Sequence, residues 1–178
     1  MSKAPTFLEA AQEFVYKNHA QANGMLTTAT LPVREGKRRG SAQFKWHRDR
    51  GMLIIKTVDL LPRGGAPKRA VTKAAKALVE DTRARELGLR AVVLESILSD
   101  ELVAKLKAAG WHSYGAVDTG NLVIVAPGSC YFCGGDPGQH GNSCEPLASA
   151  PWRCCDVCNM RHVVTERIIQ AMYVSRSA

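Results

Sequence analysis

Two Cys-x-x-Cys pairs lie in the C-terminal part of the chain. The first pair is Cys130 and Cys133, followed by two glycines, and the second is Cys155 and Cys158. Zinc binds four thiolates in a tetrahedron, and two intervening residues let both sulfurs of a pair reach one metal from a tight turn. We therefore expect these four cysteines to bind one Zn²⁺ ion. Four cysteine ligands leave no position for water, which predicts a structural metal.

Disulfide bonds or a redox-active pair are the alternative interpretations of these cysteines. Disulfides require an oxidising compartment, but the N-terminal sequence MSKAPTFLEAAQEF has no apolar signal segment. The chain has no apolar run long enough to span a membrane, so we expect a cytoplasmic protein and favour the metal. Four further metal-ligating residues stay unassigned: Cys144, Cys154, His140 and His162.

The segment 130–174 resembles treble-clef and zinc-ribbon modules. In treble clefs, a hairpin joins a Cys-x-x-Cys-Gly turn to a helix that carries the second cysteine pair. Here the second pair opens a predicted helix from Asp156 to about Val174. The composition changes at Pro127-Gly128, where the cysteines begin. We therefore expect a main domain over 1–127 and a zinc-binding module over 128–178.

The main domain is predicted to alternate between helical and extended segments, because its apolar residues change period along the chain. The expected elements, in order, are a helix over 5–21, strands over 25–33, 41–47 and 52–60, a helix over 67–87, a strand over 89–97, a helix from the Ser99 cap to Gly110, and one or two strands within 111–126. This order predicts an α/β fold with a mixed sheet flanked by helices.

The order of the pieces between residues 52 and 111 resembles the core of the GNAT superfamily of N-acetyltransferases. The matching pieces are the strand MLIIKTVDLLP, the loop RGGAPKR, the helix 67–87, the strand LRAVVLESI, the helix SDELVAKLKAA and the pair Gly110-Trp111. The resemblance implies a GNAT-like mixed sheet. It also implies transfer of an acyl group from acyl-CoA, such as acetyl-CoA, to an amine acceptor.

The resemblance places cofactor binding in the loop before the second helix. Amides at a helix N-terminus and the helix dipole attract a pyrophosphate, glycines let the backbone approach it, and basic side chains add charge. The residues expected to bind acyl-CoA are Arg63, Gly64, Gly65, Ala66, Lys68 and Arg69. An ordinary basic loop that caps the helix is the alternative interpretation.

Asp59 and Glu95 are the candidate catalytic residues, because they lie on the two strands that would flank the reaction centre. A carboxylate there could take a proton from the amine before it attacks the thioester. Alternatively, both are solvated carboxylates at strand ends. Leu106 stands where the family often has a general-acid tyrosine, and Tyr114 is a candidate replacement or a structural tyrosine.

The formal net charge of +8 favours a polyanionic partner. In the basic stretch 37–50, Lys and Arg would contact phosphates while Phe44 or Trp46 stacks on a base. Strand alternation, however, places both rings on the face of Ala42, where they would belong to the core. The second hypothesis is therefore a non-catalytic basic zinc protein that binds nucleic acid or a protein partner. The oligomeric state is not predicted.

Overall fold

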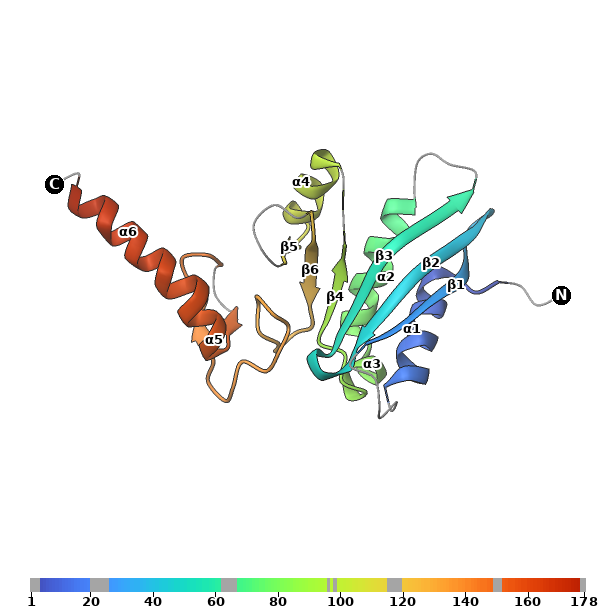
Figure 1. The fold of residues 1–178 in the computed structure, drawn as a ribbon, viewed down its shortest axis with the longest axis horizontal. Helices are drawn as coiled ribbons and strands as arrows, with labels where there is room; N and C mark the ends of the chain where they lie inside the picture. Colours follow the sequence, from blue (N-terminus) through green and yellow to red (C-terminus); the bar gives the residue numbers. More distant parts are fainter. Residues whose placement is uncertain are drawn as a thin grey trace. The chain divides into compact units, whose positions relative to one another are not determined.

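The computed structural model describes residues 4–19, 26–61, 67–95, 97, 99–114, 120–148 and 152–176. The chain divides into two compact units, Met1–Ala126 and Pro127–Ala178. The first unit is an α/β unit with a mixed sheet, and the second carries the cysteines and ends in a long helical segment (Figure 1).

A six-stranded sheet in the order β1-β2-β3-β4-β6-β5 forms the centre of the first unit. The strands are β1 (Thr27–Glu35), β2 (Arg38–His47), β3 (Met52–Leu61), β4 (Ala91–Leu94), β5 (His112–Ser113) and β6 (Leu122–Val125). β3 and β4 are parallel, and all other neighbouring strands are antiparallel. The predicted α/β class and mixed sheet are confirmed at this level.

Helices α1 and α2 lie together on one face of this sheet (Figure 1). The helices of the first unit are α1 (Phe7–Asn18), α2 (Pro67–Glu80), α3 (Thr82–Glu86) and α4 (Asp100–Ala108), and a 3-10 turn, η1 (Arg48–Arg50), links β2 to β3. The Ser99 hydroxyl accepts a hydrogen bond from the Leu102 N–H and caps α4, as predicted. Gly110 follows the end of α4 with a positive φ of 91°, a conformation that favours glycine.

The main hydrophobic core lies between the helices and this face of the sheet. Alternation along β2 brings Ala42, Phe44 and Trp46 into the core, each no more than 1% exposed. The Phe44 ring lies 5.3 Å from the Phe7 ring and 5.7 Å from the Phe14 ring of α1. Neither aromatic ring of the 37–50 stretch is therefore available to stack on a base.

The predicted single helix over 67–87 is wrong, because α2 ends at Glu80 and Asp81 starts a separate helix. Asp81 is extended (φ −67°, ψ 113°), and its carboxylate caps α3 by accepting from the Ala84 N–H. The same carboxylate accepts from Gln12 Nε2 at 2.6 Å and from the Tyr16 hydroxyl at 2.8 Å. These bonds tie α1 to the α2–α3 junction, an interaction between distant segments that helical periodicity cannot reveal.

The second unit contains a small antiparallel pair of strands, β7 (Asn142–Ser143) and β8 (Arg153–Cys154). They lead into one helical segment made of α5 (Asp156–Cys158), the π-helix η2 (Asn159–Val164) and α6 (Thr165–Arg176). The buried core of this unit is small and consists of Cys130, Cys144, Cys154, Cys158 and Val163. No helix in the described parts of the chain combines the length and hydrophobicity needed to cross a membrane.

Candidate functional site

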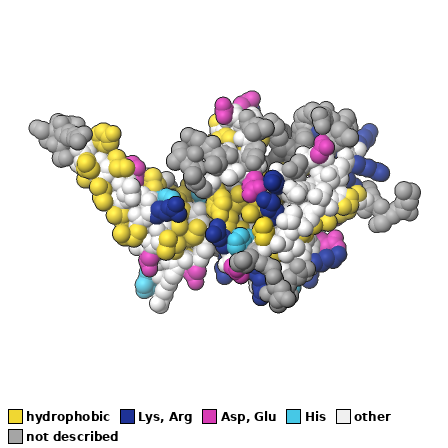
Figure 2. Space-filling model, viewed as in Figure 1, with side chains coloured by type: hydrophobic (Ala, Val, Ile, Leu, Met, Phe, Trp, Pro, Cys, Tyr) yellow, Lys and Arg dark blue, Asp and Glu magenta, His cyan; other side chains and the backbone are white. Residues whose placement is uncertain are grey.

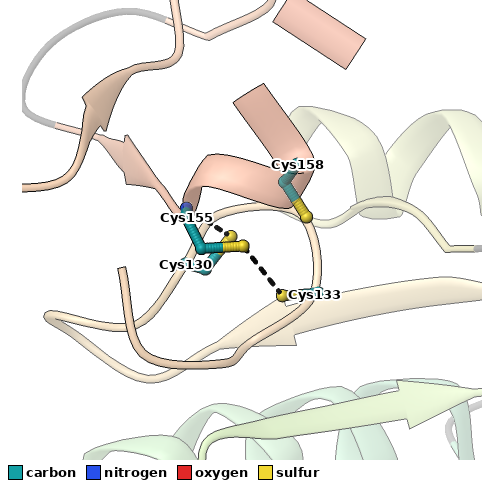
Figure 3. Close-up of side chains that lie close together, drawn as sticks. All are labelled: Cys130, Cys133, Cys155 and Cys158. Carbon is teal, nitrogen blue, oxygen red and sulfur yellow. Dashed lines mark hydrogen bonds between the residues drawn. The ribbon is translucent and has the colours of Figure 1, made fainter. Parts of the chain in front are cut away.

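The two Cys-x-x-Cys pairs meet in space, with their sulfur atoms turned toward one another (Figure 3). The Sγ atoms of Cys130, Cys133, Cys155 and Cys158 all lie within 4.8 Å of one another, and those of Cys133 and Cys155 are 3.9 Å apart. Four thiolates bound tetrahedrally at 2.3 Å would have sulfurs about 3.8 Å apart. The four cysteines could therefore hold a metal ion such as zinc.

Backbone amides around the turn and the helix start position these sulfurs. Gly135 N–H donates to Cys133 Sγ and Cys155 N–H donates to Cys130 Sγ, each at 3.4 Å. Gly134, with a φ of 72°, closes the first turn by donating its N–H to the Cys130 carbonyl at 2.8 Å. Cys155 precedes the first residue of α5 as its N-cap. Hydrogen bonds to sulfur favour the thiolate, which is the form that binds metals.

Contacts within the cluster shift the thiol pKa values in opposite directions. The hydrogen bond from Cys133 outweighs burial and lowers the pKa of Cys130 to about 4. The same bond, together with burial, raises the pKa of Cys133. Burial and the nearby Cys130 sulfur raise the pKa of Cys158 to about 12. A cation that binds to all four sulfurs therefore displaces protons from Cys133 and Cys158.

The other two cysteines and the two histidines do not belong to the four-sulfur cluster. Cys144 and Cys154 are fully buried in the core of the second unit, and burial raises the pKa of Cys144 to about 12. The His162 ring stacks on Phe132 with centroids 5.0 Å apart, and His140 is exposed. All six cysteines are free thiols in the structure.

In the first unit, β3 and β4 stay paired for only four residues each. Met52–Ile55 pairs with Ala91–Leu94, and the last hydrogen bond runs from the Glu95 N–H to the Ile55 carbonyl at 3.0 Å. Beyond this point β3 continues to Leu61 beside β2 alone among the described strands. A bulge at Lys56 marks the point of separation, and bulges increase local strand twist.

The predicted strand over 89–97 is thus longer than the paired strand, which covers 91–94. The reason is a change of partner: the Ile97 N–H donates to the Gly120 carbonyl at 2.9 Å instead of continuing the ladder with β3. The apolar residues of 89–97 gave no sign of this change, because Ile97 packs against the same core as Leu94.

Glu95 and Asp59 lie on the same face of the sheet, opposite the helices. Glu95 forms an ion pair with Lys45 of β2 at 3.3 Å, and the two side chains are 25% and 20% exposed. Asp59 is exposed and pairs in register with Ser41. Glu95 is therefore level with the point where β3 and β4 separate, whereas Asp59 is on the order of 10 Å further along β3.

Lys45 was not among the predicted site residues. The signal was present, because the alternation that buries Phe44 and Trp46 turns the intervening Lys45 to the opposite face. Its reach across β3 to Glu95, however, depends on a strand order that the sequence pattern does not state.

The proposed cofactor-binding residues fall mostly outside the described part of the chain. Arg63, Gly64, Gly65 and Ala66 lie outside the described residues, and so do the side chains of Lys68 and Arg69. The backbone of the last two forms the first turn of α2.

Leu106 and Tyr114 lie away from the two carboxylates. Leu106 is 4% exposed and belongs to the main core. The Tyr114 hydroxyl accepts from Arg50 Nη1 at 3.3 Å and contacts Met52 Sδ at 3.5 Å. Met52 pairs with Ala91 at the start of β4, the opposite end from Glu95. Tyr114 therefore does not approach Glu95 as a replacement for the missing tyrosine would.

Comparison with known proteins gives no family for this chain. No protein-family model matches it, and no curated protein matches it. Any functional inference for this chain therefore depends on the geometry of its own residues.

Proposed function

We propose that the chain is an acyl-CoA-dependent N-acyltransferase with a structural zinc ion in its C-terminal unit. The observation that carries the proposal is the separation of the parallel strands β3 and β4 after Ile55 and Leu94. In the GNAT superfamily, which residues 52–111 resemble, the pantetheine of acetyl-CoA lies between two splayed strands. The corresponding strands here are β3 and β4, and the order of the elements agrees with the resemblance.

The cofactor would lie along the part of β3 that β4 does not cover. Backbone groups of β3 beyond Ile55, on the side away from β2, would bind the amides of the pantetheine arm. The pyrophosphate would lie at the N-terminus of α2, where Pro67 opens a 14-residue helix. Arg63, Lys68 and Arg69 would neutralise its charge, and Gly64, Gly65 and Ala66 would let the backbone approach.

Glu95 is the better placed of the two candidate bases, because it lies where the strands separate. It would accept a proton from the amine as the amine nitrogen attacks the thioester carbonyl, and the CoA thiolate would leave. Lys45 holds the Glu95 carboxylate in place through the 3.3 Å ion pair. Asp59, further along β3, would instead contact the acceptor.

Zinc is the metal proposed for the four cysteines, because four thiolates at this spacing suit a tetrahedral d¹⁰ ion. Four protein ligands complete its coordination, so the metal would hold the C-terminal unit together without taking part in the reaction.

Acetyl-CoA binding tests the acyltransferase proposal. A ligand that binds only the folded state raises the melting temperature, so acetyl-CoA and desulfo-CoA should both stabilise the protein. The double variant Arg63→Ala/Lys68→Ala should reduce this shift, because the pyrophosphate loses its counter-charges. Lys37→Ala/Arg39→Ala is the matched control, since it removes two exposed charges from the turn end of the β1–β2 hairpin. Glu95→Gln should keep the shift and lose turnover.

If no form of CoA raises the melting temperature at millimolar concentration, the acyltransferase proposal is abandoned. The alternative is then a non-catalytic basic zinc protein that binds nucleic acid or a protein partner. Residues 128–178 contain four Arg and four Asp or Glu, so the first 127 residues carry the entire net charge of +8. Nucleic-acid binding by this basic part would weaken steeply with salt.

A further inference from the structure

Among the described residues, exposed large hydrophobic side chains gather in the second unit. The first unit has Leu26, whereas the second has Leu147, Trp152, Val157, Met160, Ile168, Ile169, Met172 and Tyr173. Six of these eight belong to the helical segment 156–176, with exposed fractions from 40% to 73%. Figure 2 shows hydrophobic side chains along α6. Contiguous apolar surface of this kind marks an interaction site more often than chance exposure does.

The exposed apolar residues repeat at helical spacing along the segment. Val157 and Met160 are three residues apart. Ile168 and Met172 are four residues apart, and so are Ile169 and Tyr173. Cys158 and Val163, near the start of the segment, are buried in the core of the unit, and Arg167 Nε donates to the Glu145 carbonyl at 2.9 Å. From Arg167 to Tyr173, every residue of α6 is exposed. We call this set of exposed apolar side chains the α6 face, defined by Val157, Met160, Ile168, Ile169, Met172 and Tyr173.

We propose that the α6 face pairs with the α6 face of a second copy of this chain, as an antiparallel helix pair. The charge balance of the second unit favours a second copy of this chain as the partner. Residues 128–178 have four basic and four acidic side chains, so the unit has no excess of one sign to select an oppositely charged partner. An interfacial helix on an anionic lipid surface would be rich in Lys and Arg, whereas an apolar face that is neutral overall suits its own copy.

The position of Arg161 selects the antiparallel direction. Arg161 is exposed and lies one helical turn after Val157, on the same side of the segment. Parallel pairing would bring the two Arg161 side chains together, and like charges repel. Antiparallel pairing about the middle of the segment avoids this repulsion. It places Met160 against the helical turn that contains Met172 of the second copy, and Ile168 near Val164 of the second copy.

The exposed area suits a dimer of moderate affinity. Together the six side chains expose on the order of 500 Å² per copy, so the pair would bury roughly 1,000 Å², the lower end for a specific interface. A 12-residue helix is also marginal in water without tertiary packing, and pairing would supply that packing. We therefore expect a dimer that dissociates in the micromolar range.

Sedimentation velocity of the full, zinc-loaded chain tests this proposal. The wild type should convert from monomer to dimer as its concentration rises through the micromolar range. Ile168→Asp and Met160→Asp should each weaken the dimer by at least ~10-fold, because each places a charge in the apolar contact. The matched control is Gln170→Asp, which adds the same charge at an exposed position two residues after Ile168, on the opposite side of the helix. It should leave the dissociation constant within ~3-fold of wild type.

Zinc content and far-ultraviolet circular dichroism separate loss of pairing from loss of folding, and both should be unchanged in Ile168→Asp. A wild type that stays monomeric at high micromolar concentration overturns the proposal. So does a dimer that Ile168→Asp leaves intact or that Gln170→Asp disrupts equally. Binding of monomers to anionic phosphatidylserine vesicles would replace the second copy by a lipid surface.

Discussion

The position of the sulfur atom, inside or outside the four-sulfur cluster, distinguishes the two kinds of cysteine in this protein. The Cys130 and Cys133 sulfurs each accept a backbone N–H, and these donors stabilise the thiolate that a metal requires. Cys144 lies outside this cluster, and burial raises its pKa to about 12. A buried neutral thiol behaves as a small hydrophobic side chain. Residue type is the same at both places, and membership of the four-sulfur cluster decides the role.

Substitution of single cysteines tests this distinction. Purified protein should contain about one zinc ion per chain by elemental analysis, and Cys158→Ser should lose most of it because one of four ligands is gone. Cys144→Ala should retain the metal and lower the free energy of unfolding by about 1 kcal/mol, since it only removes a buried sulfur. Loss of zinc from Cys144→Ala with retention in Cys158→Ser would contradict the ligand assignment.

At the scale of elements, the sequence predicted the order of helices and strands but not where partners change. The alternation of Ala42, Phe44 and Trp46 and the Ser99 cap are local signals, and both match the structure. The break at Asp81 and the end of β4 depend on contacts with Tyr16 and Gly120, which are distant in the sequence. The four-cysteine cluster was predictable because ligand spacing is itself local.

The Asp81 cap provides a test at this scale. Burial raises the pKa of Asp81, but the hydrogen bonds from Ala84, Tyr16 and Gln12 outweigh it and leave the pKa below its usual value. Asp81→Asn should therefore lower the free energy of unfolding at neutral pH by about 1–2 kcal/mol. Asp100→Asn is the matched control, because Asp100 is an exposed first-turn residue of α4 whose cap is Ser99.

The difference in free energy of unfolding between wild type and Asp81→Asn should depend on pH in a defined direction. A carboxyl with a depressed folded-state pKa stabilises the protein fully above its unfolded pKa, about 3.9. The stabilisation disappears as the pH falls through the folded-state value. Chemical denaturation should therefore show a constant gap between wild type and Asp81→Asn above about pH 5 that narrows in acid. If the stability difference between the two proteins widened in acid, the hydrogen bonds would not be stabilising the ionised form of Asp81.

At the scale of the whole molecule, the two units draw their stability from different sources. The core of the first unit contains large aliphatic and aromatic side chains on helices and strands, so apolar burial alone can stabilise it. Four of the five buried core residues of the second unit are cysteines. Because so little apolar surface is buried there, a bound metal would supply much of its folding free energy.

Removal of the metal should therefore unfold one unit and spare the other. With a zinc chelator, amide hydrogen exchange should rise across 127–178, including the turn at Cys130–Gly135, while β2 and β3 keep their protection. Addition of zinc should restore protection, and magnesium, which prefers oxygen ligands, should not. Equal loss of protection in β2 would mean that the first unit depends on the metal as well. Unchanged exchange in 127–178 would mean that buried thiols, and not a metal, hold the second unit together.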